Sequence, residues 1–168
     1  MSRVLSNLIL ILPFALAGCG DGRPSLVKVT GTVLLDGNPV AGAMVMFQPE
    51  VNAKSEFRRP AAAVTDASGK FVLGTYEKDD GLPPGKYKVG IQKRELIGEL
   101  PANYDAERPG DFNLKYKIVI PKKYSDPSNS GLTAEVTGSE LVPASFDLQS
   151  GGKSEIEATG PATRRSSA

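Results

Sequence analysis

Apolar and polar side chains alternate along the chain from residue 26 onward, and this alternation predicts short β-strands. Between Leu26 and Leu35, every second residue is apolar, while Lys28, Thr30 and Thr32 occupy the opposite face. The same period of two returns at residues 44–47, 62–64, 71–73, 86–93, 116–120, 132–136 and 146–148. A strand that is apolar on one side only is typical of an antiparallel sheet with one solvated face.

Turn-forming residues separate these segments. Gly37, Gly69 and Gly85 lie where a hairpin needs backbone freedom, and the side-chain oxygens of Thr65 and Asp66 can cap such a turn. The chain contains 18 Gly and 13 Pro, a load that disfavours a fold built from long helices. About seven short strands with a turn every 8–12 residues predict an all-β, antiparallel β-sandwich.

The inward positions of this pattern define a predicted core: Val29, Val33, Val45, Phe47, Phe71, Tyr87, Val89, Ile91, Val136 and Phe146. We assign the sandwich to residues 26–157, with Ile156 at a marginal edge position. Residues 94–113 hold no regular period, which predicts a long loop that is either functional or mobile. Residues 158–168 are polar and have nothing to bury, so we expect a disordered tail.

The first 18 residues predict an export signal. Arg3 precedes an apolar run that is too short to cross a bilayer comfortably as a mature helix. The run ends in Leu16-Ala17-Gly18-Cys19, which resembles the lipobox of bacterial lipoproteins. This resemblance implies a diacylglyceryl group on the Cys19 sulfur, cleavage before Cys19 and acylation of the new amino terminus. The alternative is an ordinary secretory signal that is cut after Ala17 or Gly18.

Residues 19–25 then form a lipidated tether between the membrane and the domain. Two or three acyl chains anchor a protein stably, because each buried methylene contributes about 0.8 kcal/mol. Gly20 stands where lipoproteins retained in the inner membrane of well-studied bacteria carry Asp. The resemblance therefore implies an exported protein anchored in the cell envelope, in the outer membrane rather than the inner one.

Three phrases of the chain carry a second resemblance. They are VTGTVLLDGNPVAGAMVMF from residue 29, AVTDASGKFVL from residue 63 and LPPGKYKVGI from residue 82. Together they are similar to the carboxypeptidase-regulatory-like domain, a transthyretin-like Greek-key sandwich of seven strands, over residues 27–91. The later phrases IPKKYSDPSNSGLTAEV and SFDL are similar to the C-terminal part of bacterial lipoproteins that bear this domain.

Composition argues against catalysis. The chain has no His, no Trp and one Cys, so it lacks the commonest general base and cannot form a zinc cluster or an internal disulfide. It also lacks a Gly-x-Ser-x-Gly motif. The transthyretin-like fold includes a ring-opening hydrolase of purine breakdown whose site resembles one built on His and Arg, and this chain has no His. We expect no enzyme activity, no catalytic residues, no cofactor and no metal site.

Several residues could still suggest a metal site, and each has a plainer interpretation. Asp66 and Ser68 lack the spacing of a calcium loop and are interpreted as a turn. The pair Asp79-Asp80 is interpreted as a solvated loop, and Met44 and Met46 as strand packing rather than copper ligands. Twenty basic and 19 acidic side chains leave a net charge of +1, which gives no footprint for nucleic acid.

Two groups of side chains remain as candidates for partner binding. Outward lysines could block sheet aggregation or bind an anionic envelope polymer: Lys86, Lys88, Lys93, Lys115, Lys117, Lys122 and Lys123. Aromatic residues in or near the long loop could stack on sugars or pin the loop to a core: Tyr104, Phe112, Tyr116 and Tyr124. The sequence thus favours a lipid-anchored binding or structural module with an envelope protein or glycan partner. A glycan-binding module and an accessory domain of a hydrolase are the alternatives.

Overall fold

The computed structural model describes residues 22–50, 57–152 and 155–160. The predicted signal peptide, Cys19, the start of the tether and residues 161–168 of the predicted tail lie outside these ranges. The all-β prediction is confirmed: the described residues form strands joined by turns, with two short 3-10 helices, η1 (Pro109–Asp111) and η2 (Lys122–Tyr124). Within the described residues, no helix has the length and apolar character needed to cross a membrane.

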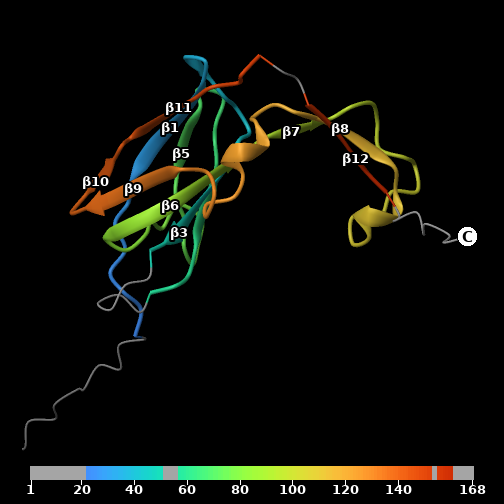
Figure 1. Ribbon diagram of the computed structural model, residues 1–168. Coiled ribbons are helices and arrows are strands. Elements are labelled where there is room, and N and C mark those ends of the chain that lie inside the picture. Colours follow the sequence, from blue (N-terminus) through green and yellow to red (C-terminus); the bar gives the residue numbers. More distant parts are fainter. Residues whose placement is uncertain (1–21, 51–56, 153–154, 161–168) are drawn as a thin grey trace, which may run out of the picture.

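Two sheets face each other and form the sandwich (Figure 1). In the first sheet, the central strand β1 (Thr30–Leu35) pairs in parallel with β11 (Ser145–Leu148). Along its other side, β1 pairs antiparallel with β2 (Asn38–Pro39) and with β5 (Lys70–Val72). The second sheet is antiparallel throughout, in the order β10 (Glu140–Val142), β9 (Leu132–Thr137), β6 (Gly85–Gln92), β3 (Met44–Pro49) and β4 (Ala61–Val64).

A third sheet lies beside the sandwich instead of stacking on it (Figure 1). It has the order β12 (Glu155–Thr159), β8 (Leu114–Ile118) and β7 (Arg94–Leu96), and all its pairings are antiparallel. We call this sheet, together with the connection 97–113, the arm.

The arm corrects three sequence predictions. Residues 94–96 form a strand, although they were predicted to begin the structureless segment 94–113. The strand predicted at 116–120 runs from 114 to 118 and belongs to the arm, not to the sandwich. Ile156 lies on an edge strand of the arm instead of the sandwich, and this strand continues through Thr159, two residues into the predicted tail. Short strands of charged residues are held mainly by backbone pairing, so side-chain alternation does not reveal them.

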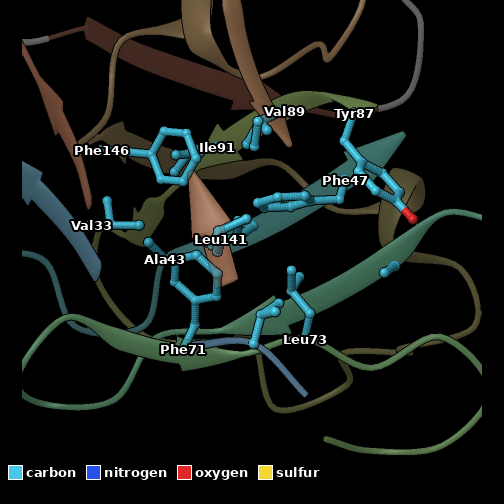
Figure 2. Close-up of a cluster of buried hydrophobic side chains, with 14 of the residues drawn as sticks. Val33, Ala43, Phe47, Phe71, Leu73, Tyr87, Val89, Ile91, Leu141 and Phe146 are labelled. Carbon is cyan, nitrogen blue, oxygen red and sulfur yellow. The ribbon is translucent and has the colours of Figure 1, made fainter. Parts of the chain in front are cut away.

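The core between the two sandwich sheets contains all ten residues that the alternation predicts, and each of them is buried. Phe47 lies at its centre (Figure 2). Its ring centroid is 6.2 Å from that of Phe71 and 6.1 Å from that of Phe146, and both partners belong to the opposite sheet. A third neighbour, Tyr87, lies 5.9 Å away on the same sheet. Aromatic contacts at these distances add to the free energy of burial.

Polar groups inside the sandwich are bonded to the backbone. The Tyr87 hydroxyl donates to the carbonyl oxygen of Pro83, four residues upstream, as in the tyrosine corners of other sandwiches. Burial raises the pKa of Tyr87 to about 12. The buried Thr65 hydroxyl donates to the Val40 carbonyl at 2.6 Å and accepts the Ala43 N–H at 2.8 Å. Among the described residues, no buried side-chain nitrogen or oxygen lacks a hydrogen-bond partner.

The predicted turn chemistry is also confirmed. Gly37, Gly69 and Gly85 all have positive φ. At Gly69 the constraint is double, because a Cβ would also lie 2.7 Å from the Val33 carbonyl oxygen. The Asp66 carboxylate caps this turn by accepting the N–H groups of Ser68 at 2.8 Å and Lys70 at 3.0 Å.

Because Phe47 contacts aromatic rings from both sheets, Phe47→Ala should open a cavity at the centre of the sandwich. We expect it to lower the free energy of unfolding by about 3–5 kcal/mol, measured by urea denaturation followed by circular dichroism. Val64→Ala is the matched control, because Val64 is 62% exposed and its truncation should change stability by no more than about 0.5 kcal/mol. Equal losses in the two variants would contradict this description of the core.

Candidate functional site

A groove of about 610 Å³ runs along β4, where this strand meets the loop that follows β5. Its apolar lining comes from Met44, Ala62, Val64, Val72 and Tyr76. The polar side of the groove is formed by residues 77–79 of the loop. Two of the lining side chains, Met44 and Val64, are 43% and 62% exposed, so the groove presents open apolar surface to solvent. We call this feature the Tyr76 groove.

The loop beside the groove is held by one carboxylate. Asp80 accepts the backbone N–H groups of Thr75 at 2.6 Å, Glu77 at 2.8 Å and Tyr76 at 3.0 Å. Burial by itself raises the pKa of Asp80, but the hydrogen bonds from Thr75, Glu77 and Tyr76 outweigh it and lower the pKa overall. The predicted acidic pair therefore has unequal roles, since Asp80 organises the loop while Asp79 occupies a turn position with φ of 60°.

Two arginines far apart in the sequence meet at Tyr76. The guanidinium carbon of Arg23 lies 4.7 Å from the centroid of the Tyr76 ring, and that of Arg59 lies 4.9 Å from it. Arg59 also donates from Nε to the Thr75 carbonyl at 2.8 Å. These contacts attach the N-terminal segment to the wall of the groove. Sequence reasoning missed this cluster, because no motif links positions 23, 59 and 76.

A second candidate surface is the outer face of the arm. Antiparallel register places Ile156 and Glu95 on either side of Lys117, and Ala158 next to Lys115. Ile97 also lies beside Lys115, because its N–H bonds to the Lys115 carbonyl at 2.8 Å. The side chains of Ile97 and Ile156 are 46% and 68% exposed. We call this surface, which combines basic and apolar side chains, the arm face.

The opposite side of the arm carries two buried apolar side chains. Leu114 and Ile118 are buried, yet neither belongs to the cluster of core residues inside the sandwich. Tyr116 shares their side of β8, and the Arg94 guanidinium lies 4.4 Å from the centroid of its ring. The arm therefore has an inside and an outside, and the arm face is the outside.

The four loop aromatics do not form a single platform. In the connection between β7 and β8, the rings of Tyr104 and Phe112 pack together, with centroids 5.2 Å apart. Tyr116 is covered by Arg94, while Tyr124 packs partly buried against the sandwich core and accepts the Gln149 N–H at 3.3 Å. Each of the four rings that we considered for stacking on sugars therefore already packs against another part of the protein.

The seven predicted outward lysines are likewise divided. Lys86 and Lys88 lie on the exposed side of β6 in the sandwich, whereas Lys115 and Lys117 lie on the arm face. The prediction that Lys93 faces water is wrong, since its side chain is only 19% exposed and lies 2.8 Å from the Glu95 carboxylate.

The remaining lysines of the set also have partners. The hydrogen bond and the charge of Lys93, and to a smaller extent the charge of Lys117, lower the pKa of Glu95. Lys122 pairs with Glu157 at 3.3 Å, and the Lys123 ammonium lies 4.6 Å from the Tyr124 ring centroid. Lys115 and Lys117 therefore supply the positive charge of the arm face.

In the part of the chain that the structure describes, no group of three or more His, Cys, Asp or Glu side chains could hold a metal ion. The predicted lipidation site, Cys19, lies outside the described residues. No family model, curated protein or solved structure matches this chain. We therefore infer function from the Tyr76 groove, from the arm face and from the place where the N-terminal segment joins the fold.

The role of Asp80 can be tested with Asp80→Asn, which keeps one acceptor oxygen and removes the charge and the second acceptor. We expect the free energy of unfolding to fall by about 1 kcal/mol near neutral pH. Since the pKa of Asp80 is lowered on folding, its contribution is fully present well above the ordinary value of 3.8 and is lost as the pH falls through the lowered pKa.

The difference between wild type and Asp80→Asn should therefore shrink in denaturation series run at progressively more acidic pH. Asp111→Asn, at an exposed position in the arm, is the control and should behave as wild type. A difference that stays constant down to the lowest pH would show that the Asp80 charge does not hold the loop.

Proposed function

We propose that this protein is a lipid-anchored, non-catalytic component of the bacterial cell envelope that presents its arm to a partner bearing acidic groups. The observation that carries the proposal is a separation in space. The described N-terminal segment reaches the sandwich at its lower end in Figure 1, whereas the arm extends from the upper right. A membrane anchor at one end and a binding surface at the other would suit the sandwich to a role as a rigid spacer.

Cys19 is separated by only a short stretch of chain from the point where the N-terminal segment joins the sandwich. Val27 and Leu82 exchange backbone hydrogen bonds at 2.9 and 3.1 Å, so the N-terminal segment is bonded to the sandwich from that point. Three residues separate Cys19 from Arg23, and a fully extended chain advances at most about 3.6 Å per residue. A lipid on Cys19 would therefore hold this end of the sandwich close to the membrane surface.

The binding side rests on the arm face. The sandwich core is complete without residues of the arm, so the arm is not needed to bury that core. Exposed Ile97 and Ile156 flank Lys115 and Lys117, a combination of apolar and basic groups that suits an acidic partner. Binding surfaces commonly lie on segments that a rigid scaffold holds in place.

Four features of the sequence support the rest of the proposal. The lipobox-like ending at Cys19 supports lipidation, and Gly20 supports the outer membrane. The resemblance of residues 27–91 to carboxypeptidase-regulatory-like domains supports a role as a non-catalytic module. The absence of His supports the same conclusion.

The anchoring proposal is tested by Cys19→Ser, which removes the only thiol in the chain. We expect wild type to fractionate with membranes and to carry acyl groups on Cys19 by mass spectrometry. The Cys19→Ser variant should accumulate as an unprocessed or unlipidated form. Ser25→Ala, in the predicted tether, should behave as wild type. A wild-type protein with an unmodified Cys19 or Gly20 at its amino terminus would sink the proposal.

The role of the arm face is tested by the double variant Lys115→Glu/Lys117→Glu in the full-length protein. We expect partner capture from solubilised envelopes to fall by about tenfold or more, because the two new Glu side chains would repel the acidic groups of the partner. The matched control is Lys86→Glu/Lys88→Glu, which reverses two charges on the exposed side of β6. Equal capture by both double variants would instead support a spacer with no binding role for the arm face.

A further inference from the structure

We propose that the Tyr76 groove binds an acyl chain of the lipid on Cys19 while the protein is in water. This inference rests on the proposed lipidation, and it assigns to the groove an occupant from the same molecule. Three observations support the inference: the chemistry of the groove, its distance from Cys19, and the lack of apolar side chains between Cys19 and Arg23.

The groove has the chemistry of a hydrocarbon site. Met44, Ala62, Val64 and Val72 line it with aliphatic groups. At one wall, the guanidinium groups of Arg23 and Arg59 lie over the ring of Tyr76. Its charged residues, Glu77, Lys78 and Asp79, come from one loop beside the groove. Its volume of about 610 Å³ lies within the range of small-ligand sites, and apolar linings are typical of such sites.

The groove is also within reach of the proposed lipid. Arg23 packs over Tyr76, which itself lines the groove, so the described chain reaches the groove at residue 23. Cys19 is four positions earlier, and its Cα therefore lies at most about 14 Å from that of Arg23. An acyl chain on the Cys19 sulfur starts close to the groove and needs no rearrangement of the sandwich to enter it.

The mature N-terminal segment carries one apolar group that could cover the Tyr76 groove. Cleavage before Cys19 removes the apolar run of residues 1–18 and leaves Cys19, Gly20 and Asp21 ahead of the described chain. Neither Gly20 nor Asp21 has an apolar side chain, so the lipid is the group on this segment that can cover Met44 and Val64. Because the groove is open to solvent, a bilayer would bury the chain more completely. The groove should therefore hold the acyl chain only away from membranes.

The test is photocrosslinking in the full-length protein with Val64→p-benzoylphenylalanine. The protein is purified from membranes, transferred to detergent-free buffer and irradiated, and its digest is analysed by mass spectrometry. The matched control is Val142→p-benzoylphenylalanine, because Val142 is 56% exposed against 62% for Val64 and lies on the opposite edge strand of the same sheet.

We expect an intramolecular crosslink between position 64 and the acyl group on Cys19. The crosslink should be absent at position 142, and it should be lost in Cys19→Ser and after reconstitution into phospholipid vesicles. A protein whose Cys19 carries lipid but gives no acyl crosslink at position 64 would overturn the inference and leave the anchoring intact. Crosslinks from position 64 to residues 4–16, to residues 51–56 or to a second copy would overturn it as well. If Cys19 carries no lipid, the anchoring proposal fails and the inference fails with it.

Discussion

The contact of Phe47 with Phe71 and Phe146 joins the two sheets of the sandwich, and the remainder of the structure depends on it. The absence of a side chain at Gly31 leaves room for the Phe71 ring, because a Cβ on Gly31 would lie 2.3 Å from that ring. The aromatic cluster fixes how β5 and β11 lie over β3 and β6. Once these strands are fixed, the edge strand β4 and the loop after β5 have defined positions, and together they form the Tyr76 groove.

The same core determines what the other segments are free to do. The sandwich core forms without Leu114 or Ile118, which are buried in the arm. On its outer face, the arm turns Lys115, Lys117, Ile97 and Ile156 toward solvent. At the other end of the sandwich, the Val27–Leu82 pairing and the packing of Arg23 on Tyr76 hold the segment that leads from Cys19. The Tyr76 groove is part of the sandwich itself, whereas the arm face belongs to a separate sheet.

The sequence allowed good prediction wherever side-chain pattern alone controls structure. All ten residues that alternation places in the core are buried there, and the turn residues Gly37, Gly69 and Asp66 behave as their chemistry requires. Prediction from the sequence failed where backbone pairing, or contacts between residues far apart in the chain, determine the structure. Nothing in Arg94–Leu96 indicates a strand, and a run of lysines along the sequence does not reveal that Lys86 and Lys117 lie on different sheets. The groove escaped prediction for a similar reason, because positions 23, 44, 64 and 76 meet only in the folded chain.

We have proposed that a lipid on Cys19 holds the end of the sandwich at the Val27–Leu82 pairing close to a membrane while the arm faces away. If Cys19 is lipidated, a cysteine introduced elsewhere is the only reactive thiol, so a fluorescent label can be placed at Lys78→Cys beside the groove or at Lys117→Cys on the arm face. The most direct measurement compares how strongly a quencher attached to lipid headgroups reduces each label's fluorescence when the lipidated protein is bound to vesicles. We expect strong quenching at position 78 and little at position 117. Equal quenching at the two positions, or stronger quenching at position 117, would contradict the account.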